Sequence, residues 1–114
     1  MLRNVLLVGA ALLIGWLALG RGGGELDGAA ARKLVAEGAV LLDVRTPAEF
    51  AAGHLDGALN VPVDELPRRL DEVGPRDKPV VIYCRSGRRS ATAASLMRQS
   101  GFAAVHDLGA MGNW

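Results

Sequence analysis

The chain has 114 residues with a formal net charge of +1 at pH 7, from 13 Lys or Arg and 12 Asp or Glu. This length leaves room for one domain, and the near balance of charge gives no electrostatic reason to expect nucleic acid as a partner. The chain has one cysteine, Cys84, and two histidines without metal-ligand spacing, which excludes an intramolecular disulfide and makes a zinc site improbable.

The N-terminal residues 4–20 carry no charge, and residues 5–19 form a strongly apolar run of 15 residues. As a helix this run is about 22 Å long, against a membrane hydrocarbon core of about 30 Å. The positive flank at Arg3 and the small-x-small pattern of residues 18–20 are typical of a signal peptide, whereas Trp16 suits an interfacial anchor. Residues 1–20 are therefore expected to be either a cleaved signal peptide or a retained membrane anchor. Both place the domain in the cell envelope, as a periplasmic protein or on the outer side of the inner membrane.

Residues 21–24, Arg-Gly-Gly-Gly, predict a flexible linker, and the folded domain is expected over residues 25–114. Within it, short apolar runs alternate with amphipathic segments, and Thr46-Pro47 is a typical helix start. Such alternation predicts an α/β domain with a mostly parallel sheet. Helices are expected over residues 27–37, 47–52, 64–73 and 90–99, and strands over residues 39–43, 58–61, 79–83 and 103–105.

The clearest predicted strand ends at Tyr83 and is followed at once by Cys84-Arg85-Ser86-Gly87-Arg88-Arg89-Ser90 and then a helix. Ligands of open α/β sheets bind beyond the carboxyl ends of the strands. Gly87 lets the loop curl so that its backbone N–H groups form a cradle for an anion at the helix N-terminus. The helix end and the three nearby guanidinium groups favour the thiolate form of the cysteine, which is the nucleophilic form. We expect Cys84 to be the nucleophile and the other six residues to bind its substrate.

Three other polar residues are expected to be structural. Asp43 and Arg45 flank a strand end and are expected to tie loops together by hydrogen bonds. His54 precedes a turn and is expected to be a framework residue, because an ionised thiol needs no general base.

Four segments of the chain, residues 42–50, 53–62, 83–90 and 108–114, resemble the rhodanese family of single-domain sulfurtransferases. The resemblance runs from about Glu25 to the end, although Ala110 stands where the family usually has a second glycine. It implies a five-stranded sheet between helices, a persulfide on Cys84, and transfer of sulfane sulfur from thiosulfate to cyanide or a thiol. It implies no metal and no organic cofactor.

Two other functions fit parts of the same pattern. The active-site loop of cysteine phosphatases has the pattern Cys-x5-Arg. This chain has Cys-x4-Arg from Cys84 to Arg89 and places Ser90 at the phosphatase arginine position. The shorter loop favours sulfur transfer over phosphate-ester hydrolysis. A non-catalytic persulfide carrier or docking module for a dedicated envelope partner would need the same Cys84 loop, and the sequence leaves that alternative open.

Overall fold

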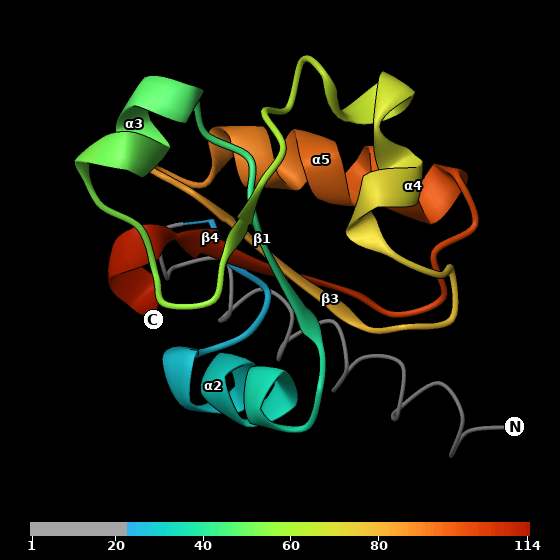
Figure 1. Cartoon of the computed structure of the whole chain (residues 1–114). Coiled ribbons are helices and arrows are strands. Elements are labelled where there is room, and N and C mark those ends of the chain that lie inside the picture. Colours follow the sequence, from blue (N-terminus) through green and yellow to red (C-terminus); the bar gives the residue numbers. More distant parts are fainter. Residues whose placement is uncertain (1–22) are drawn as a thin grey trace, which may run out of the picture.

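The computed structural model describes residues 23–114, which form a parallel sheet between two layers of helices (Figure 1). The strand order is β2-β1-β3-β4, and all three neighbouring pairs are parallel. The elements in chain order are α2 (Gly28–Ala36), β1 (Val40–Asp43), α3 (Pro47–Ala52), β2 (Leu59–Asn60), η1 (Leu66–Arg68), α4 (Leu70–Val73), β3 (Val80–Cys84), α5 (Arg88–Gln99), β4 (Val105–Ala110) and η2 (Met111–Asn113).

The predicted α/β class and parallel sheet are confirmed, with differences in three elements. The helix expected over residues 64–73 is divided into η1 and α4, with Pro67 inside the first piece. Helix α5 begins at Arg88 rather than Ser90, which shortens the connection after Cys84 to three residues. The last strand lies at Val105–Ala110 rather than at residues 103–105.

The expectation of five strands is wrong, because the described residues form a sheet of four. Residues 23–26 lie where a further edge strand would pair with β4, but only one backbone hydrogen bond joins them, from Glu25 N to Asp107 O at 2.6 Å. The Asp107 N–H instead points to the Glu25 carboxylate, with 3.4 Å between N and Oε1. A side chain therefore takes the position that a backbone acceptor would need for the ladder to continue.

The described part of the expected linker is packed against the domain. Gly24 is buried, and a Cβ atom at this residue would lie 2.1 Å from the Leu108 carbonyl oxygen. Glycine is required here because the strand backbone passes so close. The expected signal peptide or anchor, residues 1–20, lies outside the described residues. Within residues 23–114, no helix has the length and apolar character needed to cross a membrane.

The sheet has an apolar core on each face, as the alternation of side chains along its strands requires. Leu42 and Ile82 point into the larger core beneath α4 and α5, whereas Leu41 and Val81 point into the smaller core beneath α2. Figure 1 shows α2 on one side of the sheet and α4 and α5 on the other. With both faces covered, the carboxyl ends of the central strands are left as the place where polar chemistry can reach solvent.

Candidate functional site

The nucleophile predicted from sequence lies at the carboxyl end of the central strand β3. Cys84 is the last residue of β3, and its side chain is fully buried. Its Sγ accepts a hydrogen bond from the Gly87 N–H, with 3.0 Å between the two heavy atoms. Gly87 has φ +103°, a left-handed conformation that folds the connection back over the sulfur. A small-molecule reactant can therefore reach Sγ only when the atoms that cover the sulfur move.

Helix α5 begins directly after this turn, with Gly87 as its N-cap and no side chain capping its first N–H groups. The partial positive charge of a helix N-terminus is thus placed at the sulfur. Ser90 is fully buried, and its Oγ donates to the Gly87 carbonyl oxygen at 3.1 Å. This bond closes the turn, so Ser90 holds the loop in shape. Ser86, the residue before Gly87 in the turn, is exposed.

The three loop arginines, which are expected to bind the substrate, do not share one environment. Arg85 and Arg88 are exposed, and neither forms an ion pair with another residue of the described range 23–114. Arg89 is half-buried and binds the Glu49 carboxylate through both terminal nitrogens, at 2.6 and 3.0 Å. The three positive charges are thus close together in the sequence, but that of Arg89 is neutralised by Glu49, which lies 40 residues away on α3.

Glu49 is the site residue that sequence reasoning missed. It is the third residue of α3, where it forms a capping box with Thr46: Thr46 N donates to Glu49 Oε1 at 3.1 Å, and Glu49 N donates to Thr46 Oγ1 at 3.2 Å. The hydrogen bonds from Arg89, followed by that from the Thr46 backbone, lower the pKa of Glu49 to about 2. The capping box is readable from Thr-x-x-Glu, but no local pattern reveals the partner on α5.

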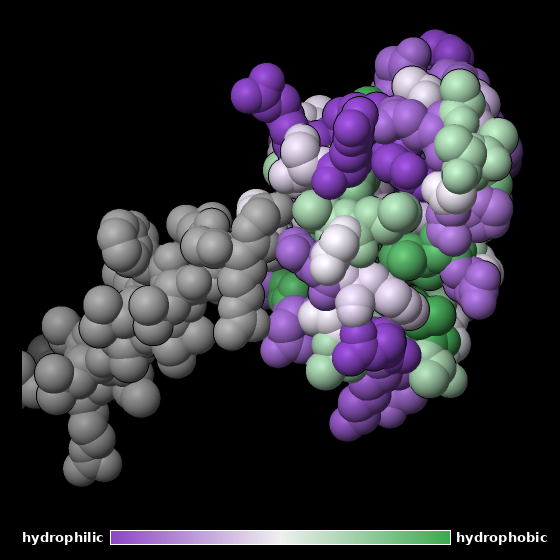
Figure 2. Space-filling model, turned by 90° about the vertical axis from the view of Figure 1, so that its left-hand side faces the viewer, coloured by the Kyte–Doolittle hydropathy of each residue, from purple (hydrophilic) through white to green (hydrophobic). Residues whose placement is uncertain are grey.

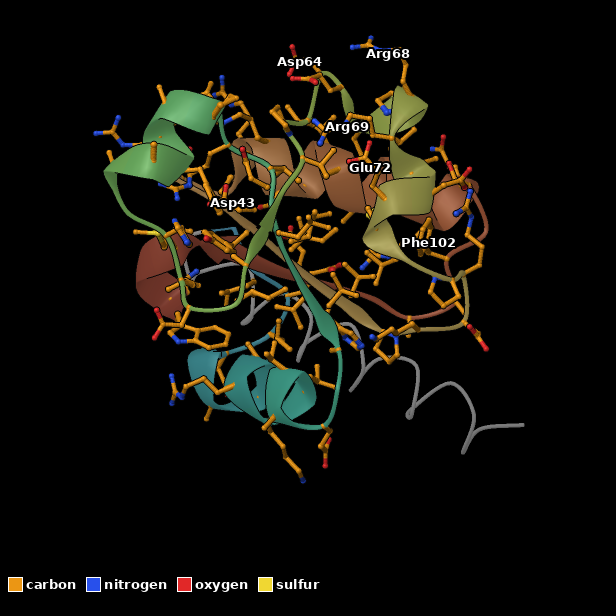
Figure 3. All side chains as sticks on the ribbon, viewed as in Figure 1. Asp43, Asp64, Arg68, Arg69, Glu72 and Phe102 are labelled. Atoms are coloured by element: carbon orange, nitrogen blue, oxygen red, sulfur yellow. The ribbon has the colours of Figure 1, made fainter. Side chains whose placement is uncertain are left out.

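The carboxyl end of β1 is held by a second ion pair. Asp43 and Arg45 are both buried, and Arg45 Nη2 lies 2.6 Å from Asp43 Oδ2 (Figure 3 labels Asp43). The same nitrogen donates to the Gly53 carbonyl oxygen at 2.7 Å, and the Asn60 amide donates to the Asp43 and Arg45 carbonyl oxygens at 3.0 Å. Three loops are joined by these bonds, so the predicted structural role of Asp43 and Arg45 is confirmed.

Tyr83, the residue before Cys84, belongs to the opposite face of the sheet. It is fully buried, and its hydroxyl oxygen accepts a hydrogen bond from the Leu55 N–H at 3.1 Å. Burial raises the pKa of Tyr83 to about 12. The strand that presents the sulfur is thereby tied to the turn between α3 and β2.

Beneath the loop lies a buried carboxyl group that no local sequence pattern singles out. Asp107 is 2% exposed, and its Oδ1 accepts from the Gly109 N–H at 2.9 Å. Burial raises the pKa of Asp107, and hydrogen bonds from Ser90 and from the Gly109 backbone oppose that shift. Because Ser90 contacts both Asp107 and Gly87, this carboxyl group supports the end of the loop from the side of β4.

The remaining polar groups near the site are accounted for by packing. His54 is exposed, stacks on Phe50 with 3.7 Å between ring centroids, and pairs through Nδ1 with the Phe50 carbonyl oxygen. This fits the framework role expected for it. Within residues 23–114, no three His, Cys, Asp or Glu side chains are grouped so that they could hold a metal ion.

Figure 2 turns the molecule so that the side carrying α3 faces the viewer. Hydrophilic residues gather in the upper part of this face, at the height of α3 and the start of α5, above a band of more hydrophobic residues. The site therefore combines a single sulfur at a helix N-terminus with a polar, arginine-bearing surface. That arrangement suits covalent chemistry with a small anion.

Comparisons with known proteins agree with this geometry. A sulfurtransferase of Allochromatium vinosum is 46% identical over 63% of this chain and 66% of its own length. The thiosulfate sulfurtransferase PspE of Escherichia coli is 31% identical over 61% of this chain and 68% of its own length. Among solved structures, the human single-domain sulfurtransferase TSTD1 superposes with a TM-score of 0.66 at 30% identity, covering 78% of this chain and 89% of that one. The model of the rhodanese-like domain matches residues 27–114, and the chain belongs to this family.

Proposed function

We propose that this protein is a thiosulfate sulfurtransferase that carries sulfane sulfur as a persulfide on Cys84. The observation that carries the proposal is the position of Sγ, at the end of β3, hydrogen-bonded to Gly87 N at 3.0 Å and placed at the uncapped N-terminus of α5. A thiolate is stabilised by such donors and by a helix N-terminus. The similarity to sulfurtransferases from two bacteria supports the same reaction class.

In the first step the Cys84 thiolate attacks the outer sulfur of thiosulfate. A new S–S bond forms, the S–S bond of thiosulfate breaks, and its electron pair leaves with sulfite. The negative charge moves from Sγ to the terminal persulfide sulfur. The Gly87 N–H and the first turn of α5 are the groups available to hold that charge.

In the second step an anionic acceptor, cyanide or a thiolate, attacks the terminal sulfur of the persulfide. The persulfide S–S bond breaks, its electron pair returns to Sγ, and thiocyanate or the acceptor's persulfide leaves. Neither step transfers a proton if Cys84 and the acceptor are ionised, so no histidine is required. The loop is held in shape by the hydrogen bond from Ser90 Oγ to the Gly87 carbonyl oxygen.

Two measurements test this function. Steady-state assays should show thiosulfate-dependent thiocyanate formation, and intact mass after incubation with thiosulfate should rise by one sulfur atom. Cys84→Ser should abolish both while leaving the melting temperature close to that of the wild type, because the exchange is nearly isosteric. Turnover that survives in Cys84→Ser would remove the nucleophile from the proposal.

The same assays separate an enzyme from a persulfide carrier. A carrier would gain one sulfur atom in the mass measurement but would show no repeated turnover with cyanide or small thiols. Hydrolysis of a chromogenic phosphate ester without thiosulfate turnover would instead favour a phosphatase.

We further propose that residues 1–20 direct the chain to the cell envelope. The support is the uncharged apolar run after Arg3. Cell fractionation combined with N-terminal sequencing tests the proposal. Recovery of the protein with an intact N-terminus in the cytoplasmic fraction would contradict it, whereas cleavage near Gly20 would identify a signal peptide and retention in the membrane fraction an anchor.

A further inference from the structure

The Glu49–Arg89 pair is more tightly built than a chance surface contact. Both terminal nitrogens of Arg89 bind the carboxylate, at 2.6 and 3.0 Å, and the two side chains are 33% and 26% exposed. Glu49 Oε1 also receives the Thr46 N–H and the Thr46 hydroxyl, each at 3.1 Å. The carboxylate is thus fixed by α3 before it meets the arginine. Pre-organised bidentate pairs of this kind are stronger than single contacts.

This pairing changes the charge that the loop can offer to an anion. Asp43 neutralises Arg45, and Glu49 neutralises Arg89, so these four groups contribute no net charge. The unpaired positive charges of the loop are those of Arg85 and Arg88, as far as the described residues go. An anion approaching the sulfur therefore meets two free guanidinium groups rather than the three that the sequence suggests.

We propose that Glu49 sets how strongly the Cys84 loop attracts anionic reactants, by occupying the guanidinium group of Arg89. This inference rests on the proposed function in that the anions are thiosulfate and the sulfite it releases. A loop with a third free arginine would bind thiosulfate more tightly but would also retain sulfite. Glu49 is therefore a specificity-determining residue that favours product release, and it does not itself touch the sulfur.

Glu49→Gln tests the proposal, because the amide keeps an oxygen that can accept from Thr46 but removes the negative charge. The KM for thiosulfate and the inhibition constant for sulfite should both fall about threefold to tenfold in low salt, the range expected for one unit charge near a dianion at high effective dielectric constant. Both changes should shrink in 0.5 M salt, where charges are screened within a few ångströms.

Arg89→Ala should have the opposite effect, because it leaves the Glu49 carboxylate unpaired beside the site. The double variant removes a neutral pair, so its KM should return to within about twofold of the wild type. A double variant as impaired as Arg89→Ala would show that Arg89 contacts the donor directly, which would overturn the proposal. An unchanged or raised KM in Glu49→Gln would overturn it as well.

A matched control is available on α4. Glu72 forms a similar two-nitrogen pair with Arg69, the N-cap residue of α4, at 2.8 and 2.9 Å, and Figure 3 labels both residues. Glu72→Gln changes the net charge of the protein by the same amount without touching the Glu49–Arg89 pair. Its KM should stay within about twofold of the wild type. An effect equal to that of Glu49→Gln would assign the change to overall charge and refute a local role.

A second readout does not depend on sulfur transfer. Cys84 is the only cysteine of the chain, so alkylation is read from intact mass without ambiguity. Iodoacetate and iodoacetamide attack through the same carbon but differ in charge, so the ratio of their rates reports the local potential at the sulfur. Glu49→Gln should raise this ratio about threefold or more, and an unchanged ratio would refute the inference even if thiosulfate proves not to be the donor. Failure of the wild type to turn over thiosulfate, with the ratio shifted, would refute only the proposed function.

Discussion

The packing of residues 23–25 against the sheet predicts a large effect from a very small substitution, Gly24→Ala. The added Cβ would lie 2.1 Å from the Leu108 carbonyl oxygen, more than an ångström inside normal contact, and 2.8 Å from the carbonyl carbon. Leu108 is fully buried in β4, which is paired with β3, so its backbone has little room to yield. The N-terminal segment must lift instead and lose the hydrogen bond from Glu25 N to Asp107 O.

The cost of forcing such a contact is about 1–3 kcal/mol of the free energy of unfolding. In a domain of this size, each kcal/mol lowers the Tm by about 4–8 °C. Thermal unfolding followed by circular dichroism should therefore show a Tm for Gly24→Ala at least about 4 °C below that of the wild type.

Gly112→Ala is the matched control for this experiment. A Cβ at Gly112 meets no atom within 4 Å, and its backbone is not in the left-handed region. The control should be neutral or slightly stabilising, because alanine restricts the unfolded chain. Equal melting temperatures for the wild type and Gly24→Ala would refute the packed arrangement and restore the flexible linker expected from the glycine-rich sequence.

Three further predictions concern charge and ionisation. Arg89→Ala should raise the KM for thiosulfate at least about threefold in steady-state assays, whereas Arg98→Ala should leave it within about twofold, because Arg98 binds Glu25 and the Val105 carbonyl oxygen rather than the loop. Since the pKa of Glu49 is lowered to about 2, its contribution to stability is present above its unfolded value of about 4.5 and is lost as the pH falls toward 2. The free energy of unfolding, measured with urea between pH 6 and pH 3, should fall less in Glu49→Gln than in the wild type. An equal fall in the two proteins would contradict this. Since the pKa of Tyr83 is raised to about 12, its contribution is present below pH 10 and is lost as the pH rises toward 12. Tyr83→Phe should be less stable at pH 8, because the Leu55 N–H loses its acceptor, but should lose less stability than the wild type between pH 9 and pH 11.

Several features of the site could be predicted because they depend on neighbouring residues in the chain. The apolar run before Cys84 is a strand because it is buried on both faces of a parallel sheet. Gly87 permits the left-handed turn, and the helical segment after it supplies the N-terminus that faces the sulfur. Thr46 and Glu49 form a capping box because they are three residues apart.

Other features could not be predicted because they join distant parts of the chain. Nothing near Arg89 in the sequence indicates that its charge is neutralised by Glu49, 40 residues earlier. The edge of the sheet was also decided by tertiary contacts, because the Glu25 side chain takes the Asp107 N–H that a fifth strand would need.

The sequence by itself determined the order of the elements and the position of Cys84 at a strand end. Only the tertiary structure decided how much positive charge the loop keeps and which segments close the sheet. The physical reason is that strand, turn and cap preferences act over a few neighbouring residues, whereas an ion pair or a sheet edge forms between whichever groups the packed core brings together.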